Sequence, residues 1–476
     1  MSVQAGRGAT ISRPAAPPPP LAPRRTAVAW SLVAATIALA GTAAWGAALQ
    51  RGGTDLTLFA APFFADWGPR PSWGLVLPVA IALTIASCGP RVARVLPWRR
   101  LLVVAWTTTI AWSVALSAST GWAGLTRSVR SRYDYAAALP VVHRVGLGPF
   151  VGTYVARLGD APTHVKSHPP GMVVLLRGLE VLGLHGSGWA AAALVAVTAT
   201  VPVAVVVTVR RLGAGSAARA VLPFLVCGPW TLLVATVADG LFAATVVWGI
   251  ALLAAATSAG DRRHAAALAL VSGALLAGSL YLSYGLVPLA AALAAAVLLS
   301  SGRYHLVAPL LAGATVVVAA WTLAGFDWLD GFSAARALYH AGAAAHRPYS
   351  YFVLANVVVF AVMLGPAVVA AWAHRPTRPA TAERGASSLD PFVRPLRWLV
   401  GAAVIAVAIA DLSPGCRRAR SSASGCRSCP SPRWSWSASP RAAAPGGGSP
   451  RKRLLPSPSR HCSSGPGRRR RSCGCS

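Results

Sequence analysis

Acidic residues are scarce in this chain. Its 476 residues include 12 Asp and Glu against 44 Lys and Arg, and charged residues of both signs make up only 12% of the sequence. A soluble protein of this length would carry a larger charged surface, so the composition argues against that class. Walker-type phosphate loops and dinucleotide-binding glycine fingerprints are also lacking. That absence argues against a nucleotide-powered transporter and against a nucleotide-sugar domain.

Apolar runs dominate the chain instead. Hydrophobic residues make up 55% of the sequence, and runs of about the length that crosses a bilayer recur from residue 26 to residue 410. We place them at 26–49, 73–88, 101–119, 187–209, 219–237, 240–257, 264–280, 283–300, 304–324, 351–373 and 396–410. The first run is too long for a secretory signal, and more spans follow it. The sequence therefore predicts an all-α fold, a polytopic transmembrane helix bundle of about eleven spans over residues 26–412, after a disordered segment at 1–25.

The distribution of arginine orients these spans. The run Gly171 to Gly186 is short and carries Arg177 and Glu180, which is typical of a helix lying along the membrane surface. If that run does not cross, the basic clusters at 24–25, 91–100, 210–211, 262–263, 303 and 375–397 all fall on one side, as the positive-inside rule requires. We therefore predict a cytoplasmic N-terminus and an external loop at 120–186. Enrichment in Ala, Gly, Arg and Pro indicates a GC-rich bacterial gene and hence the plasma membrane.

The segment 413–476 differs from the rest. Much of the net charge of +32 and six of the eight cysteines lie in it, without helical periodicity. A disordered basic tail, a cysteine metal site and translation in the wrong frame compete as explanations. CxxC at Cys426 and Cys429 lacks a second pair at finger spacing, which disfavours the metal. RSSASGCRSCP (420–430) can be encoded by codons whose shifted frame reads VERIWLPFLP, an apolar segment. We favour a frameshift near Ser413, so the charge gives no reason to expect a nucleic-acid partner.

Two aspartates stand out among the acidic residues that this topology places outside. Asp134, in SRYDYAAALPVVHRV, follows the third span and begins an external helix. It is a candidate general base, and the structural alternative is a helix N-cap or a partner for Arg130 or Arg132. Asp239, in ATVADGLFAA, lies between apolar runs, where a carboxylate is costly unless it faces water, a cation or a substrate. Its structural alternative is a short Asp-Gly turn.

The motif THVKSHPPGM (163–172) is polar and rigid in an otherwise apolar chain. Consecutive prolines fix an extended backbone and keep His168 out of helical geometry, so the loop ends stiffly where Gly171 begins the interfacial helix. Such a joint can hold His164, Lys166 and His168 over the membrane surface as substrate-binding residues. The structural alternative is a rigid helix entry whose polar side chains contact lipid headgroups.

These motifs, in this order, resemble a family. YDYAAALPVV, HVKSHPPGMVVLL, VADGLFAA and HRPYSYFVLANVVVFAVMLGPA are similar to segments of actinobacterial integral membrane proteins related to the GT-C glycosyltransferase superfamily. The likeness covers roughly residues 26–412, and the pattern of that group continues past DLS with an ERIWLPF-like segment. It implies a membrane glycosyltransferase, of hexosyl or pentosyl type, that moves a sugar from a polyprenyl-phosphate donor to a glycan or lipid acceptor of the cell envelope.

The resemblance assigns roles to particular residues. Asp134 takes the role of catalytic base, and Asp239 is a second acidic site. Arg347, Lys166 or His168 would neutralise the donor phosphate. His164 and Tyr349 are further substrate-binding candidates beside them. A single acid stands where better-known members have an Asp-Glu pair. A divalent cation is therefore left open, and we name no metal ligand. The competing hypotheses are a transporter or lipid flippase and an inactive frameshifted remnant.

Overall fold

The structure is a computed structural model. It describes residues 25–56, 58, 60–63, 68, 71–342, 347–366, 368–369 and 393–412. The chain divides into two units, Met1–Ala419 and Arg420–Ser476, and every described residue belongs to the first. The predicted disordered N-terminus lies outside the described residues apart from Arg25, and the basic tail with its proposed frameshift lies outside them altogether.

Helices make up almost the whole of the described chain. Those that precede the central span are α1 (Arg25–Arg51), α2 (Val76–Val95), α3 (Trp98–Ser117), α4 (Leu139–Val145), α5 (Leu147–Gly152), α6 (Tyr154–Arg157), α7 (Thr163–Ser167), α8 (Gly171–Val181), α9 (Ser187–Thr198), α10 (Val201–Arg211), α11 (Gly215–Val226) and α12 (Thr231–Val234). Those that follow are α13 (Ala238–Thr257), α14 (Arg262–Leu280), α15 (Leu286–Ser301), α16 (Val307–Leu323), α17 (Trp328–Ala341), α18 (Tyr349–Leu364) and α20 (Val393–Leu412). The described residues contain no strand, so the all-α prediction is confirmed for them.

Seven helical segments are long and apolar enough to cross a membrane. They are Ala29–Arg51, Trp73–Val95, Trp98–Ser117, Ser187–Arg211, Ala238–Thr257, Arg262–Leu280 and Tyr304–Leu323. Four shorter apolar helices overlap the remaining predicted runs: Gly215–Val226, Leu286–Ser301, Tyr349–Leu364 and Pro395–Ile409. The first of them ends at Val226, well before the end of the run predicted at 219–237. The helices fit a multi-pass membrane protein, while the count of eleven spans stays a prediction. Helix α8 has 11 residues and is not among the candidate spans.

Helix α13 forms the centre of the bundle. It packs against α9, α10, α14 and α15. Of its most apolar 18-residue stretch, 67% is buried inside the protein, compared with 11% for the corresponding stretch that contains α2. Small residues allow the closest helix approach, between α14 and α16. A Cβ on Gly273 would overlap the carbonyl oxygen of Leu310, and a Cβ on Gly313 would overlap that of Leu270. Such glycine contacts let helix backbones touch, as is common between membrane helices.

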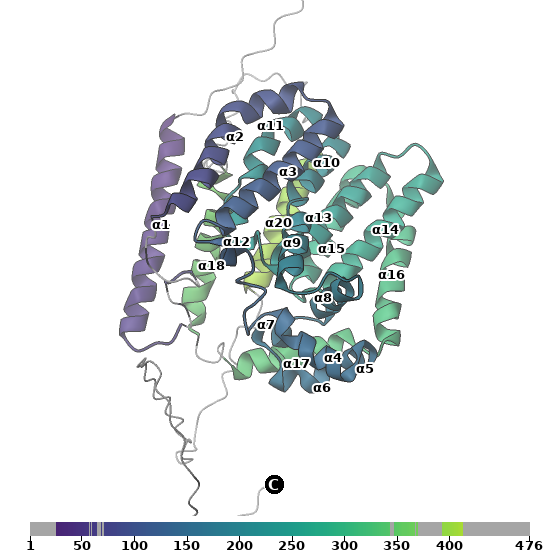
Figure 1. Cartoon of the computed structure of the whole chain (residues 1–476). Helices are drawn as coiled ribbons and strands as arrows, with labels where there is room; N and C mark the ends of the chain where they lie inside the picture. Colours follow the sequence, from purple (N-terminus) through teal and green to yellow (C-terminus); the bar gives the residue numbers. More distant parts are fainter. Residues whose placement is uncertain are drawn as a thin grey trace, which may run out of the picture. The chain divides into compact units, whose positions relative to one another are not determined.

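Segments predicted to lie on the same side of the membrane meet at the same end of the bundle (Figure 1). At one end Arg219 donates hydrogen bonds to the carbonyl oxygens of Ala93 (2.6 Å) and Leu96 (2.9 Å), so the α2–α3 and α10–α11 junctions adjoin. At the other end the Trp328 indole donates to the Leu280 carbonyl at 2.9 Å, and α4 to α7 gather with α17. These contacts agree with the alternation predicted from the arginine positions for the segments that they join, and the side of the membrane on which each end lies stays a prediction.

Candidate functional site

Asp134 begins a single turn of 3-10 helix, η3 (Tyr135–Ala138), which leads directly into α4. Its backbone is extended (φ −86°, ψ 170°), and its Oδ1 accepts the backbone N–H of Tyr135 at 2.7 Å. The N-cap that the sequence offered as the structural alternative is therefore present. The pairing with Arg130 or Arg132 is not, because both ion pairs found among the described residues involve Glu180. The half-buried carboxylate of Asp134 thus caps a turn and forms no ion pair with a described residue.

The two histidines of the THVKSHPPGM motif lie next to this turn. The backbone N–H of His164, on α7, donates to the carbonyl oxygen of Tyr133 at 2.9 Å, which ties the two segments together. Nδ1 of His168 lies 2.9 Å from the carbonyl oxygen of His164. A carbonyl can only accept, so Nδ1 carries the proton and, in the neutral ring, Nε2 keeps its lone pair. Burial lowers the pKa of His168 and favours that neutral form.

Tyr135 is the centre around which the candidate residues gather. Its side chain is buried, and its ring lies 5.7 Å from that of His164, 5.6 Å from that of His168 and 6.1 Å from that of Phe242. Burial is the main cause that raises the pKa of its hydroxyl, and the charges of Asp239 and Asp134 raise it further. Both carboxylates therefore lie close enough to the phenol to act on it electrostatically. Three segments distant in sequence meet here.

Asp239 reaches this cluster from the first turn of α13. Asp239 and Gly240 both belong to that helix, so the turn proposed as the structural alternative is wrong. Glycine follows the aspartate because a Cβ at Gly240 would overlap the side chain of Thr198 on α9 and lie 2.6 Å from the Val234 carbonyl oxygen. The Asp-Gly pair thus reflects close packing of α13, and the Asp239 side chain itself is exposed. An acidic residue is favourable there because it faces the positive end of the helix dipole.

The rigid joint predicted for the HPPG segment is present, with one correction. His168 is extended (φ −130°, ψ 160°), but Pro170 has helical angles (φ −69°, ψ −9°) and directly precedes α8. The proline φ suits both geometries, so the backbone turns into the helix at the second proline instead of staying extended. The Tyr154 hydroxyl lies 2.9 Å from the Val165 carbonyl oxygen and 2.8 Å from that of His168. Tyr154 is fully buried, so it anchors the joint.

Asp134 and His168 have environments suited to proton transfer. Burial raises the pKa of Asp134, its amide hydrogen bonds and the nearby His164 act in the opposite direction, and Asp239 raises it slightly more. A carboxylate with a raised pKa is a stronger proton acceptor than a solvated one. Since His168 is neutral, its free Nε2 can accept a hydrogen bond. The cluster can therefore remove a proton from a hydroxyl group placed against it.

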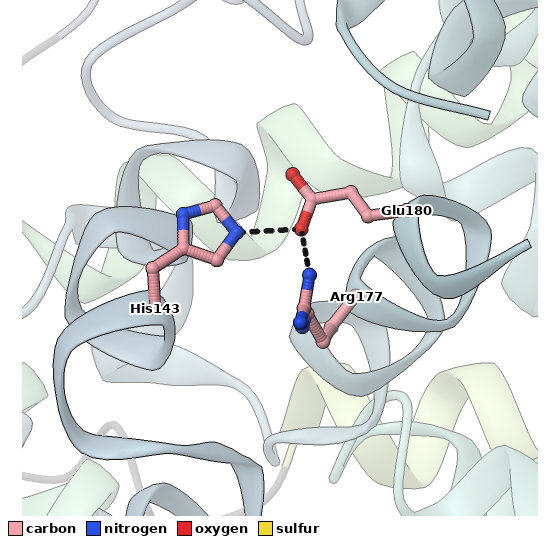
Figure 2. Close-up of polar contacts among 3 residues, drawn as sticks. All are labelled: His143, Arg177 and Glu180. Carbon is pink, nitrogen blue, oxygen red and sulfur yellow. Dashed lines mark hydrogen bonds and ion pairs between the residues drawn. The ribbon is translucent and has the colours of Figure 1, made fainter. Parts of the chain in front are cut away.

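Glu180, in contrast, is an ion-paired carboxylate in the same layer of short helices (Figure 2). Its Oε2 lies 2.7 Å from Nε2 of His143 on α4 and 3.1 Å from a guanidinium nitrogen of Arg177, one turn earlier on α8. Burial opposes ionisation, but the hydrogen bonds from His143 and Arg177 outweigh it and hold the pKa of Glu180 below its usual range. This triad joins α4 to α8 and has a structural role.

The other predicted substrate-binding residues are not part of the cluster around Tyr135. Lys166 lies on α7 with a half-buried side chain, and it makes no hydrogen bond through that side chain to a described residue. Arg347 lies 5.0 Å from the Phe352 ring, and Tyr349 begins α18, which packs against α1. No described contact connects Arg347 or Tyr349 to Asp134.

Aromatic residues complete the site in a way that sequence reasoning missed. Tyr135, Phe242 and Tyr154 enclose or anchor the histidines, yet none was a candidate. Tyr135 and Phe242 lie inside the quoted motifs, the first next to Asp134 and the second in DGLF. Their closeness in sequence to the candidate aspartates could have indicated them as site residues. Among the described residues, no group of three or more His, Cys, Asp or Glu side chains is arranged to hold a metal ion. The divalent cation left open above stays untested.

Comparisons of the chain with protein-family models, with curated proteins and with solved structures gave no match.

Proposed function

We propose that this protein is a membrane glycosyltransferase that moves a sugar from a polyprenyl-phosphate donor to a cell-envelope acceptor at the outer face of the plasma membrane. The observation that carries the proposal is the half-buried Asp134. It forms no ion pair with a described residue, and the ring of the neighbouring Tyr135 lies 5.6 Å from that of His168 and within the electrostatic reach of Asp239, at one end of an apolar helix bundle. This arrangement is what a general base needs.

The proposed reaction uses these groups in defined roles. Asp134 accepts the proton of the acceptor hydroxyl as its oxygen forms a bond to the anomeric carbon of the sugar. The bond from that carbon to the lipid phosphate breaks, and the phosphate leaves with the electron pair as an anion. His168 orients the acceptor through Nε2, and Asp239 binds a further sugar hydroxyl. Lys166 neutralises the phosphate, and His164 contacts the donor.

The position of charged residues favours an enzyme over the competing transporter or flippase. In each of the seven candidate spans, every Asp, Glu, Lys, Arg or His lies close to one end. Transporters that move charged substrates carry ionisable groups near the bilayer midplane, often at broken helices. A carboxylate cluster at the bundle end, next to short surface helices, better suits chemistry on a lipid headgroup.

An Asp134→Asn variant tests the proposal. Asparagine caps a helical turn about as well as aspartate, so the fold should persist, whereas an amide cannot accept the proton. In membranes supplied with polyprenyl-phosphate sugars, we expect the wild-type rate of sugar transfer to fall about a hundredfold or more. Asp330→Asn is the matched control, because Asp330 is an exposed carboxylate at the same end of the bundle. It should leave the rate unchanged.

Other outcomes would favour the competing hypotheses. Equal rates for wild type and Asp134→Asn would eliminate Asp134 as the base. Movement of lipid across the membrane of vesicles without any sugar transfer would favour the flippase.

The gene should also be resequenced across codons Leu412 to Pro430. An inserted or missing base would restore an apolar C-terminal segment, and the assays should then use the corrected chain; an intact frame would favour the inactive remnant for this copy.

A further inference from the structure

A hollow lined by arginine lies in the layer of short helices, separate from the cluster around Tyr135. Its volume is about 650 Å³, and Asp134, Asp239, His164 and His168 are not among the residues that line it. The walls come from the segment 132–138 before α4, from α4 to α7 and from the turns between these helices. Phe150, Tyr154, Leu158 and Val165 form a buried apolar floor. A hollow of this size can hold a small molecule or a headgroup.

The charge of the hollow is positive. Arg132, Arg144 and Arg157 line it together with a single acidic residue, Asp160. In the part of the chain that the structure describes, both ion pairs belong to Glu180, so Asp160 does not pair with any of these guanidinium groups. Three positive charges and one negative charge leave a net charge of +2 at its walls. Like charges held together repel, and an anionic ligand would relieve that repulsion.

Two of the guanidinium groups are held in place by the protein. Nε of Arg157 donates to the hydroxyl of Thr153 at 2.8 Å, and that hydroxyl donates to the Pro149 carbonyl oxygen at 2.6 Å. The guanidinium carbon of Arg132 lies 4.8 Å from the centre of the Tyr133 ring, and its NH2 group donates to the hydroxyl of that residue. Fixed guanidinium groups lose less conformational entropy when they bind an anion than mobile ones do.

We infer that this hollow binds a phosphate or diphosphate group. Arginine forks pair with phosphate oxygens through two parallel hydrogen bonds, and an apolar floor accommodates the carbon skeleton that carries the phosphate. The inference does not depend on the proposed glycosyl transfer, because the ligand could be carried by a lipid or by a water-soluble molecule. The hollow is nevertheless connected to the Asp134 cluster, since Tyr133 lines it and accepts the His164 backbone N–H at 2.9 Å.

Binding of inorganic pyrophosphate to the full chain in neutral detergent tests the inference by titration calorimetry. We expect the double variant Arg144→Gln/Arg157→Gln to bind at least about tenfold more weakly. Arg127→Gln is the control, because Arg127 is exposed on the loop that carries Arg132 but does not line the hollow. It should change the affinity less than twofold. Asp160→Asn should bind more tightly, and a misfolded variant could not produce that gain.

Three results would overturn the inference. They are no binding of pyrophosphate by the wild type, equal weakening by Arg127→Gln and by the double variant, or no tightening by Asp160→Asn.

Competition identifies the source of the phosphate. Displacement of pyrophosphate by micelles containing phosphatidylglycerol, but not by micelles containing phosphatidylcholine, indicates an anionic lipid headgroup. Failure of both to displace it, with the variants behaving as expected, indicates a water-soluble phosphate. Loss of sugar transfer in Asp134→Asn leaves this binding unchanged, so the two proposals fail separately.

Discussion

Asp134 and Glu180 are carboxylates in the same layer of short helices, but their surroundings differ. Glu180 accepts hydrogen bonds from His143 and Arg177, and these interactions hold its pKa below the usual range despite burial. Asp134 accepts a backbone N–H from its own turn, and burial raises its pKa. Environments that push two carboxyl pKa values apart often separate a reactive group from a structural one. In this layer, the charge of Glu180 joins two helices, while that of Asp134 is available for chemistry.

Helix α8 connects the two sites. Its first residue, Gly171, is the last residue of the HPPG joint that begins with His168, and Glu180 lies in its last turn. The backbone N–H of Gly171 donates to the carbonyl oxygen of Tyr281 at 2.9 Å, and a Cβ at this position would overlap that same oxygen. Because the obstacle is backbone, it cannot move aside as a flexible side chain would. The start of α8 is therefore fixed against the α14–α15 connection.

The largest expected effect on stability comes from Gly171→Ala. We expect it to lower the free energy of unfolding by about 1–3 kcal/mol, the usual cost of an overpacked site, and to displace His168. Gly178→Ala is the matched control in the same helix. Nothing lies within 4 Å of a Cβ there, so the lower backbone entropy of alanine should raise stability by about 0.5–1 kcal/mol. Thermal unfolding of the full chain in detergent measures both. Shifts of the same sign would contradict the role given to Gly171.

Much of the fold could be predicted from sequence because it rests on local patterns. Each predicted apolar run contains a helix, but α11 ends at Val226 inside the run 219–237. The contacts of Arg219 and Trp328 at the two ends agree with the alternation predicted from the arginine positions. Asp134, Asp239, His164 and His168 were candidates because of the motifs that carry them, and the rings of both histidines lie near Tyr135 in the structure. These are properties of single segments and of their order along the chain.

The remaining features depend on which segments become neighbours. Arg347 was grouped with Lys166 and His168, but α18 packs against α1, and sequence alone does not reveal that partner. Tyr154 looked like one aromatic residue among many, although its hydroxyl lies within hydrogen-bond distance of two carbonyl oxygens in the histidine motif. The glycine of Asp-Gly suggested a turn, because the close approach of Thr198 to Gly240 involves a helix some forty residues away. Long-range packing decided each case.

A smaller loss of stability is expected for Glu180→Gln, which tests the structural half of the comparison. The variant keeps an acceptor for Arg177 and His143 but loses the charge. The His143 side chain is 46% exposed, so solvent weakens the pair. We expect a loss of about 1 kcal/mol in unfolding free energy, with little effect on sugar transfer. Asp330→Asn removes an exposed carboxylate that has no ion pair among the described residues, and it should cost less, because only the interaction with the dipole of α17 is lost.

A double-mutant cycle separates the ion pair from other effects of the substitution. If Glu180 acts through His143, the stability losses of Glu180→Gln and His143→Gln should be less than additive when combined. Additive losses would show that the 2.7 Å contact contributes no coupling energy. Loss of sugar transfer in Glu180→Gln with unchanged stability would reverse the roles assigned to the two carboxylates.

The smallest effect is the pH dependence of stability, which should have opposite signs for the two residues. The folded-state pKa of Glu180 is lowered from 4.5, so the unfolded chain binds this proton more tightly. Stability from Glu180 is then present above pH 4.5 and is lost as the pH falls through the folded pKa. The folded-state pKa of Asp134 is raised from 3.8, so the native state binds its proton more tightly. Acidification from that raised value down to 3.8 therefore stabilises the fold through Asp134.

Melting temperatures of the wild type, Glu180→Gln and Asp134→Asn, measured from pH 7 to the lowest pH at which the chain stays soluble, isolate the two contributions. The advantage of the wild type over Glu180→Gln should shrink on acidification, because only the wild type can lose the ionised pair. The wild type should gain relative to Asp134→Asn over the same range, because only the wild type can protonate the buried carboxyl. Two differences that move in the same direction would mean that Asp134 and Glu180 share one kind of environment, and the distinction between a reactive and a structural carboxylate would fail.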